Sequence, residues 1–356
     1  MNINVILGMS GGVDSSVAAY ILKKKGYNVI GIFMINWDEK NVSYCTVAKD
    51  LVDTQKICKF LNIKLHVVNF SFDYWQEVFF YFLNEYKIGK IPNPDIVCNS
   101  RIKFNIFLEY SKYLGADFIA TGHYAMIKYI KNNYFLYKSF DLNKDQTYFL
   151  YKLRQWQLKY IIFPLYKYNK FFIRQLAVNV GLYNCMKKDS NGICFVGKAD
   201  FKNFLKKYIS VCYGFITNFY NKQFGIHEGI MFYTYGQKKN LNNKCFLFNL
   251  QYIVDKYLYK NELIISNKNR LYTYYCIIKD VNFINKFLFF NIKCYVKLRH
   301  SYVMEKCKLK YLTGNLFIIE FYFAQDYISS GQSVVFYKNN ICFGGGIVSN
   351  VGLTFV

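Results

Sequence analysis

Apolar residues along the first third of the chain follow two alternating patterns, short continuous runs and helical repeats. The runs predict buried strands at 5–7, 29–34, 65–70 and 118–120, and the repeats predict helices over 15–25, 47–61, 74–86 and 102–114. Gly26 follows the first of these helices, at a position where glycine commonly ends a helix. Strands that alternate with helices predict an α/β fold with a doubly wound parallel sheet, which binds its ligands beyond the carboxyl ends of the strands.

The pattern changes twice further along the chain. Helical spacing dominates 145–208, most clearly over 169–181, and after residue 211 short aromatic and β-branched segments alternate with Asn and Gly turns. The second half therefore predicts a small β-rich middle domain followed by a C-terminal β-barrel. We place the three domains at 1–208, 209–275 and 276–356, the first of them consisting of the parallel sheet and a helical extension.

Composition narrows the class of partner. The 356-residue chain carries 46 Lys and Arg against 22 Asp and Glu, a formal net charge of +24, which favours a nucleic acid because basic groups release the counterions of a phosphate backbone. A general bias toward Lys, Asn, Ile, Tyr and Phe is the alternative source of part of this charge. No apolar run reaches the roughly 18 residues of a membrane span, and the first residues do not resemble a secretion signal. We expect a soluble, cytoplasmic protein without a membrane partner.

The eleven cysteines do not suggest a disulfide or zinc framework. Their odd number argues against a set of structural disulfides, and the absence of a C-x-x-C pair argues against a tetrahedral zinc site, so we expect no tightly bound metal. Cys212, Cys276 and Cys342 stand among apolar neighbours and are predicted to be core thiols. Cys98 and Cys194 stand in polar, turn-forming segments and are the candidates for chemistry.

The strongest local signal is a loop between the first strand and the first helix, Gly8-Met9-Ser10-Gly11-Gly12-Val13-Asp14-Ser15-Ser16. Adjacent glycines let the backbone turn tightly and approach a ligand, and the N–H groups at the start of the helix attract an anion. The alternative is an ordinary Gly-rich turn with a Ser cap. The loop resembles the phosphate loop of the ATP pyrophosphatase superfamily, whose members adenylate an oxygen and release pyrophosphate. This resemblance implies ATP, with Mg²⁺ on the nucleotide, bound by the residues from Gly8 to Ser15.

Two further segments hold the candidate nucleophiles. Cys98 ends the sequence Asn93-Pro94-Asp95-Ile96-Val97-Cys98. We predict that it lies outside the core and just before the helix at 102–114, where the helix dipole, Arg101 and Lys103 would lower its pKa and favour the thiolate. Cys194 follows Lys187-Lys188-Asp189-Ser190-Asn191-Gly192-Ile193, an electropositive loop that a sulfur donor and a substrate could both reach. For either cysteine alone, the alternative is a partly buried bystander.

Together with the ATP loop, these segments resemble tRNA-specific 2-thiouridylases of the MnmA type along nearly the whole chain. The resemblance implies a tRNA-uridine 2-sulfurtransferase that adenylates oxygen 2 of the wobble uridine, at position 34, and replaces it with sulfur. Cys194 would carry a persulfide, and Cys98 would be the nucleophile that attacks it and forms a transient disulfide with Cys194. The implied partners are the tRNAs for Lys, Glu and Gln and a cysteine desulfurase or a sulfur-relay protein.

The same resemblance assigns binding residues. Met34 and Gly122 would complete the ATP site. Contacts with the target base and the tRNA would come from Asn93, Pro94, Asp95, His123, Lys144, Asp145, Gln146, Arg299, His300 and Gln332, the last three from the C-terminal domain. Judged from the residues alone, Asp145 is typical of a helix N-terminal cap.

Three positions depart from the family pattern. His300 stands where Tyr is usual, Lys238 where Arg is usual and Asn240 where Gly is usual. We expect these changes to affect tRNA affinity more than the chemistry. The alternative to an enzyme is a non-catalytic tRNA-binding protein derived from one, which would bind tRNA without releasing pyrophosphate. The intact loop at 10–16 favours the enzyme.

Overall fold

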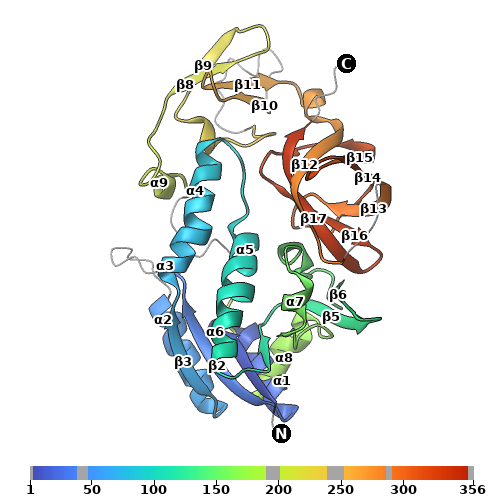
Figure 1. Ribbon diagram of the computed structural model, residues 1–356. Coiled ribbons are helices and arrows are strands. Elements are labelled where there is room, and N and C mark those ends of the chain that lie inside the picture. Colours follow the sequence, from blue (N-terminus) through green and yellow to red (C-terminus); the bar gives the residue numbers. More distant parts are fainter. Residues whose placement is uncertain (1–2, 38–46, 190–200, 239–251, 286–290, 352–356) are drawn as a thin grey trace.

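The computed structural model describes residues 3–37, 47–189, 201–238, 252–285 and 291–351. The molecule is elongated, with the N-terminal domain at one end, a small sheet at the other and a barrel beside the two (Figure 1). Two long helical segments run side by side from the N-terminal sheet toward the small sheet. No helix among the described residues is long and apolar enough to cross a membrane.

The N-terminal domain confirms the predicted parallel sheet. Its strand order is β3-β2-β1-β4-β7, and every pairing between neighbours is parallel. The strands are β1 (Asn4–Met9), β2 (Asn28–Ile35), β3 (Lys64–Asn69), β4 (Phe118–Ala120) and β7 (Ile161–Ile162). Helices α1 (Val13–Lys24), α2 (Val47–Phe60) and α8 (Lys170–Val180) pack around it. Strand β1 is buried over most of its length, which explains its continuous apolar run.

The two long helical segments differ in how well the sequence predicted them. The first contains α3 (Ser71–Tyr74), the π-helical η1 (Trp75–Phe79) and α4 (Phe80–Lys87), close to the predicted helix at 74–86. The second contains α5 (Pro94–Val97), the π-helical η2 (Cys98–Ile106) and α6 (Phe107–Tyr113). The predicted start at 102 is wrong, because Asn93 caps this segment and Pro94 occupies its first position, where proline favours a helix.

The region predicted to be mostly helical is helical only in part. It holds α8 and three short elements, η3 (Thr147–Phe149), α7 (Gln155–Leu158) and α9 (Phe201–Leu205). A hairpin that the patterns did not predict precedes it, β5 (Ala125–Ile130) and β6 (Asn133–Lys138). Strand β6 pairs with β17 of the barrel, so this hairpin extends the sheet of another domain.

The second half of the chain confirms the predicted β-rich domains. The small middle sheet has the order β10-β11-β8-β9 and mixes parallel and antiparallel pairs. Its strands are β8 (Gly214–Thr217), β9 (Gln223–His227), β10 (Tyr252–Tyr257) and β11 (Glu262–Ser266), and they are accompanied by the short helices η4 (Ile230–Phe232) and η5 (Lys268–Leu271). The barrel consists of β12 (Thr273–Phe283), β13 (Asn291–Lys297), β14 (Glu305–Thr313), β15 (Leu316–Gln325), β16 (Ser333–Lys338) and β17 (Ile341–Val351). Antiparallel pairing of β12 with β17 closes it.

The predicted core thiols are confirmed in two cases out of three. Cys276 and Cys342 are buried, but Cys212 is exposed. Cys212 lies in the irregular segment just before β8, where its sulfur accepts a hydrogen bond from Asn261 at 3.3 Å. Apolar neighbours in the sequence therefore did not place this residue in a core.

Candidate functional site

The Gly- and Ser-rich loop joins β1 to α1 at the carboxyl edge of the parallel sheet. Gly11 has a φ of +68°, and Gly12 is the N-terminal cap of α1. The Ser15 hydroxyl accepts the Ser10 N–H at 3.3 Å and donates to the Gly12 carbonyl at 3.1 Å, so the loop is held by its own serines. The first-turn N–H groups of a helix have no acceptor within that helix and can bind an anion.

Residues from three neighbouring strands converge on this loop. An added Cβ on Gly8 would lie 3.3 Å from Met34 Cε and 3.7 Å from Thr121 Cγ2. An added Cβ on Gly122 would lie 3.0 Å from the Ser15 nitrogen and 3.1 Å from the Asp14 carbonyl carbon. The structure thus brings Gly8, Met34 and Gly122 together with the loop, as expected of residues at the carboxyl ends of adjacent parallel strands.

Two residues that the sequence reasoning did not assign to the loop support it from outside. The buried amide of Asn184 donates to the Gly11 carbonyl at 3.1 Å and to the Ser16 hydroxyl at 3.0 Å, and its own oxygen has no partner among the described residues. Lys187 donates to the same carbonyl at 3.2 Å and pairs with Asp50 and Asp53 at 2.7 and 2.6 Å. The charge of Lys187 is thus compensated, which corrects the view that it makes the Cys194 loop electropositive.

Asp14 lies in a network of charged side chains beside the loop. Lys170 bridges the carboxylates of Asp14 and Asp189, each at 2.7 Å. Tyr124 donates its hydroxyl to Asp14 at 2.8 Å, and Arg174 pairs with Asp189 at 2.9 Å. Burial raises the pKa of Asp189, but hydrogen bonds from Lys144 and Lys170 outweigh it and bring the pKa to about 2. Because Asp14 already has two partners, its carboxylate is poorly placed to be a primary ligand of Mg²⁺.

Asn93, Pro94 and Asp95 form the start of the second long helical segment. The Asn93 side chain accepts the N–H groups of Asp95 and Ile96 at 3.1 and 3.3 Å, and Pro94 is buried. Surrounding protein atoms raise the pKa of Asp95, while the charges of Lys103 and His300 oppose that rise. The carboxyl of Asp95 therefore lies near groups from two other parts of the site.

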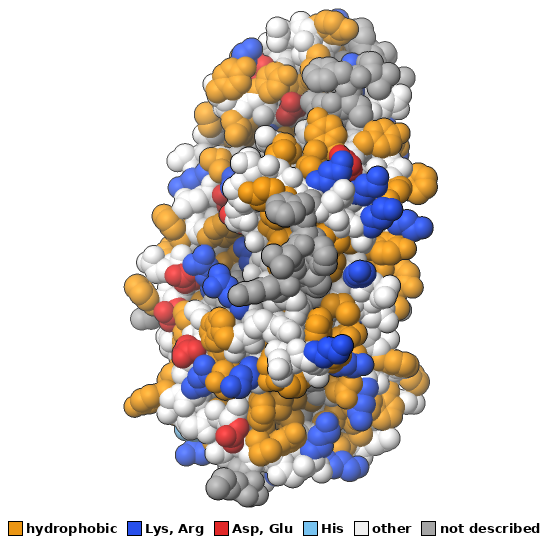
Figure 2. Space-filling view, turned by 45° about the vertical axis from the view of Figure 1, so that its right-hand side comes forward, with side chains coloured by type: hydrophobic (Ala, Val, Ile, Leu, Met, Phe, Trp, Pro, Cys, Tyr) orange, Lys and Arg blue, Asp and Glu red, His pale blue; other side chains and the backbone are white. Residues whose placement is uncertain are grey.

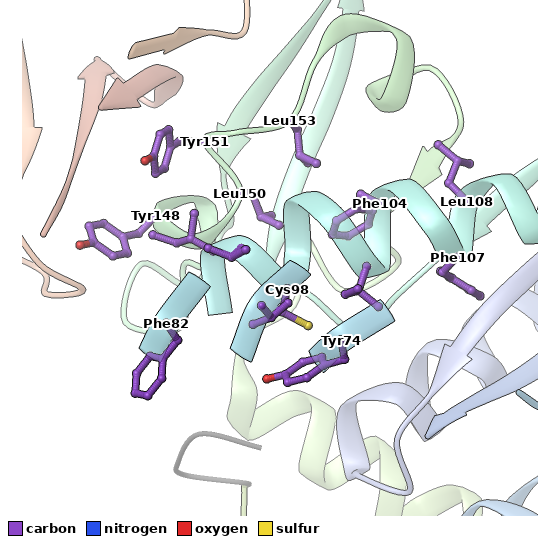
Figure 3. Packing of buried hydrophobic residues seen from close by; sticks show 14 of the residues in the cluster. Tyr74, Phe82, Cys98, Phe104, Phe107, Leu108, Tyr148, Leu150, Tyr151 and Leu153 are labelled. Carbon is purple, nitrogen blue, oxygen red and sulfur yellow. The ribbon is translucent and has the colours of Figure 1, made fainter. Parts of the chain in front are cut away.

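Cys98 is in the core, contrary to the prediction. It is 3% exposed and begins the π-helical segment η2, one turn inside a helix that starts at Pro94. Figure 3 shows its sulfur directed toward Tyr74, within a cluster of apolar side chains. Arg101 is exposed and pairs with Glu77. Helical spacing from Pro94 turns Cys98 inward, which the short polar segment around it concealed. Cys194 lies outside the described residues.

His123 is held between aromatic rings close to the loop. Its Nδ1 lies 2.8 Å from the Thr121 hydroxyl, and its ring centroid is 5.7 Å from Phe104 and 6.0 Å from Phe163. Burial, and then the charge of Lys103, lower the pKa of His123 well below its ordinary value. His123 is therefore a neutral side chain near pH 7.

A cavity of about 630 Å³ lies where the three domains meet. Four of the predicted RNA-binding residues line it, Asn93, Arg299, His300 and Gln332. The middle domain adds Gln237 and Lys238, whose ammonium lies 5.6 Å from the ring centroid of Tyr252. Lys239 and Asn240 lie outside the described residues. Figure 2 shows more Lys and Arg than Asp and Glu side chains on the face that it draws, and such an excess of positive charge attracts a polyanion.

The segment Lys144-Asp145-Gln146 makes contacts inside the protein. Asp145 is buried, accepts the Thr147 N–H at 3.3 Å and pairs with the buried Lys297 at 3.2 Å. The buried Asp145 carboxylate cannot contact RNA directly in this structure. The predicted N-terminal cap is also wrong, because the cap position of η3 is held by Gln146, one residue later. Lys144 pairs with Asp189 at 2.8 Å but stays partly exposed.

In the described residues, no group of three or more His, Cys, Asp or Glu side chains could hold a metal ion. The donors at the loop are instead N–H groups, hydroxyls and ammonium groups. This set of donors suits a phosphate.

Three family descriptions match successive parts of the chain. Residues 3–198 match a "tRNA methyl transferase HUP domain", 202–267 a "tRNA methyl transferase PRC-barrel domain" and 274–348 an "Aminomethyltransferase beta-barrel domain". The first match alone covers more than half of the chain.

Whole-length relatives are proteins named tRNA-specific 2-thiouridylase MnmA. The chain is 46% identical to that of Buchnera aphidicola subsp. Acyrthosiphon pisum, covering 98% of this chain and 97% of the relative. It is 43% identical to that of Colwellia psychrerythraea, covering 98% and 96%, and 42% identical to that of Alkaliphilus oremlandii, covering 98% and 97%. The likeness therefore extends over all three parts of the structure.

Proposed function

The chain belongs to the MnmA family of tRNA-specific 2-thiouridylases, and we infer from its site how the reaction proceeds. It is a tRNA-modifying transferase that uses ATP and forms 2-thiouridine in tRNA. The observation that carries our proposal is the convergence of Met34 and Gly122 on the Gly- and Ser-rich loop, in a molecule whose domains enclose a basic cavity.

The carboxyl edge of the parallel sheet fits ATP. An alanine side chain at Gly122 would cover the Ser15 N–H group, one of those that would hold a phosphate, and one at Gly8 would crowd Met34. We propose that Gly8 through Ser15 bind the phosphates and that Met34 contacts the adenosine. Mg²⁺ would bind to the phosphates, because Asp14 is occupied by Lys170 and Tyr124. When bound, ATP supplies an AMP group that turns the uridine oxygen into a leaving group.

The target base would enter from the cavity between the domains. Asn93, Pro94 and Asp95 would surround the wobble uridine, position 34, and His123 would lie close to it. An anticodon loop is single-stranded, so turning a base out costs less than it would in a duplex. Arg299, His300, Gln332 and Lys144 would contact the rest of the anticodon arm, where Arg presents a planar fork of donors to phosphates or base edges.

Sulfur would reach the base by way of two cysteines. We propose that Cys194 carries a persulfide and that the Cys98 thiol attacks its inner sulfur. A Cys98–Cys194 disulfide forms and hydrosulfide leaves. The hydrosulfide attacks carbon 2 of the adenylated uridine, AMP departs with the former oxygen 2, and a thiol reductant returns both cysteines to thiols. Because Cys98 is covered in this structure, its attack requires the aromatic cover that includes Tyr74 to open.

The remaining assignments concern partners. We propose that the tRNAs served are those for Lys, Glu and Gln, and that a cysteine desulfurase or sulfur-relay protein in the cytoplasm supplies the persulfide. The net charge of +24 supports a tRNA partner, since each phosphate contact releases counterions.

The decisive experiment is a sulfur-transfer assay with purified protein, ATP, Mg²⁺, a cysteine desulfurase with cysteine, and unmodified tRNA for Lys. Nucleosides are identified by mass spectrometry and pyrophosphate is measured in parallel. We expect 2-thiouridine only with ATP. Cys98→Ser and Cys194→Ser should abolish it but retain tRNA binding, and Cys212→Ser, an exposed cysteine of the middle domain, should behave like the unsubstituted protein.

Other outcomes would change the assignment. Tight tRNA binding without pyrophosphate or 2-thiouridine would replace the enzyme by a non-catalytic tRNA-binding protein. Normal thiolation by Cys98→Ser would remove Cys98 from the mechanism and leave Cys194 as the direct donor.

A further inference from the structure

Three consecutive residues connect three separate parts of the site. Lys144 Nζ lies 2.8 Å from Asp189, the last described residue before the segment that contains Cys194. Asp145 pairs with Lys297 at the end of β13 in the barrel. Gln146 Oε1 accepts the N–H of Tyr124 at 2.9 Å. Residues 144–146 therefore link Lys297 of the barrel to Tyr124, which contacts Asp14 of the ATP loop.

The ATP end of this link is Tyr124. Its side chain is 2% exposed, and its hydroxyl donates to Asp14 in the first turn of α1. Both of its backbone groups are held by Gln146, which also donates its own N–H to the Tyr124 carbonyl at 2.9 Å. Burial, and then the charge of Asp14, raise the pKa of Tyr124, so its hydroxyl remains a donor. The position of Gln146 therefore sets the position of the group that holds Asp14.

The barrel end of the link is His300. Its Nε2 lies 3.3 Å from the Asp145 carbonyl oxygen, and its ring centroid is 4.6 Å from that of Phe149. His300 is exposed and lines the cavity between the domains. Lys297, three positions earlier, is buried against Asp145. A ligand that binds at His300 therefore contacts a side chain within hydrogen-bond distance of the Asp145 backbone. The next residue, Gln146, holds Tyr124.

We propose that Tyr124 is a positioning residue, and that the segment 144–146 transmits RNA binding at His300 to Asp14 in the ATP loop. This proposal rests on the proposed function, which identifies the bound RNA as tRNA. RNA in the cavity then strengthens ATP binding, and ATP strengthens RNA binding by the same factor, because coupling between two sites is reciprocal.

The test measures the dissociation constant of α,β-methylene ATP, an analogue that cannot release pyrophosphate, by calorimetry with and without unmodified tRNA. For the unsubstituted protein we expect tRNA to tighten binding at least about fivefold. Tyr124→Phe removes only the hydroxyl, and it should bring the ratio of the dissociation constants without and with tRNA close to one. Tyr129→Phe is the matched control, because among the described residues the Tyr129 hydroxyl bonds locally, to Asn132. This variant should show the same ratio of dissociation constants as the unsubstituted protein.

A double substitution tests the other end. His300→Phe keeps a ring against Phe149 but loses the contact with the Asp145 carbonyl, so it should also abolish the ratio, and combining it with Tyr124→Phe should add nothing further. If Tyr124→Phe fails to fold, the test depends on His300→Phe alone, in which tRNA should no longer tighten binding of the analogue.

The proposal is overturned if tRNA does not tighten binding of the ATP analogue to the unsubstituted protein. It is also overturned if tRNA still tightens that binding to the same extent in either single variant. If tRNA tightens binding of the analogue but no 2-thiouridine forms in the sulfur-transfer assay, the proposed chemistry is refuted and the coupling through residues 144–146 is retained. If 2-thiouridine forms normally but tRNA has no effect on binding of the analogue, the coupling is refuted and the proposed chemistry is retained.

Discussion

Gly11 is the position where a single methyl group tests the ATP loop most directly. Its φ of +68° lies in the left-handed region, and an added Cβ would come 2.5 Å from the Asp50 carbonyl oxygen. Asp50 belongs to α2 and its carboxylate is paired with Lys187, so this backbone cannot withdraw without disturbing that ion pair. Gly11→Ala must therefore displace either the loop or the start of α2.

The magnitude follows from two separate costs. An L-residue in the left-handed region loses about 1–2 kcal/mol, and forcing an extra methyl group into a packed site costs about 1–3 kcal/mol more. Gly26→Ala isolates the first cost, because Gly26 has a φ of +82° and nothing within 4 Å of an added Cβ. If the loop yields to relieve the second cost, ATP binding weakens by about tenfold for each 1.4 kcal/mol.

The assay compares both variants in pyrophosphate release at saturating tRNA and in thermal unfolding. We expect Gly11→Ala to raise the KM for ATP about 10- to 100-fold. Gly26→Ala should leave KM unchanged and lower the melting temperature slightly. If the two variants share the same KM and melting temperature, the close contact with Asp50 does not control the loop and the reasoning fails.

Further predictions concern other parts of the structure. Lys297→Met breaks a buried ion pair and should cost about 3 kcal/mol of stability in denaturant unfolding; Lys310→Met removes an exposed pair with Glu320 and should cost less than about 1 kcal/mol. The pKa of His123 is lowered in the folded protein, so the unfolded chain binds its proton more readily. Its contribution to stability is full above the ordinary His pKa and is lost as the pH falls from there toward the folded-state pKa. Melting temperatures between pH 7 and 5 should therefore fall less steeply for His123→Gln, and an unchanged slope would contradict the burial. Arg299→Ala should reduce the slope of log tRNA affinity against log salt by about 1, and an identical slope would exclude a phosphate contact.

Elements whose cause is local were predictable from the sequence. The apolar run before Gly8 and the glycines after it fix β1, the loop and the start of α1 within a few neighbouring residues. The helix over 169–181 has both of its ends marked, by Asn169 as cap and by Gly181 with a φ of +79°. In such cases the chain carries its own start and stop signals.

Elements that depend on distant partners were not predictable. Cys98 is buried because a helix that starts at Pro94 turns it toward Tyr74, which comes from another helix. Asp145 is buried because Lys297, from a strand of the barrel, compensates its charge. Tyr124 directly follows the predicted site residues Gly122 and His123, but no local pattern reveals its bond to Asp14.

The hairpin β5–β6 makes the boundary between domains in space differ from the boundary along the chain. Leu136 and Tyr137 of β6 pair with Cys342 and Ile341 of β17, and the Lys138 N–H donates to the Asn340 carbonyl. A fragment cut after residue 208 would expose the edge of β6, and a fragment that begins at the barrel would expose the edge of β17. The shared sheet also joins the barrel to the domain that contains the parallel sheet. An RNA that contacts both domains therefore has to span the distance between the barrel and the parallel sheet.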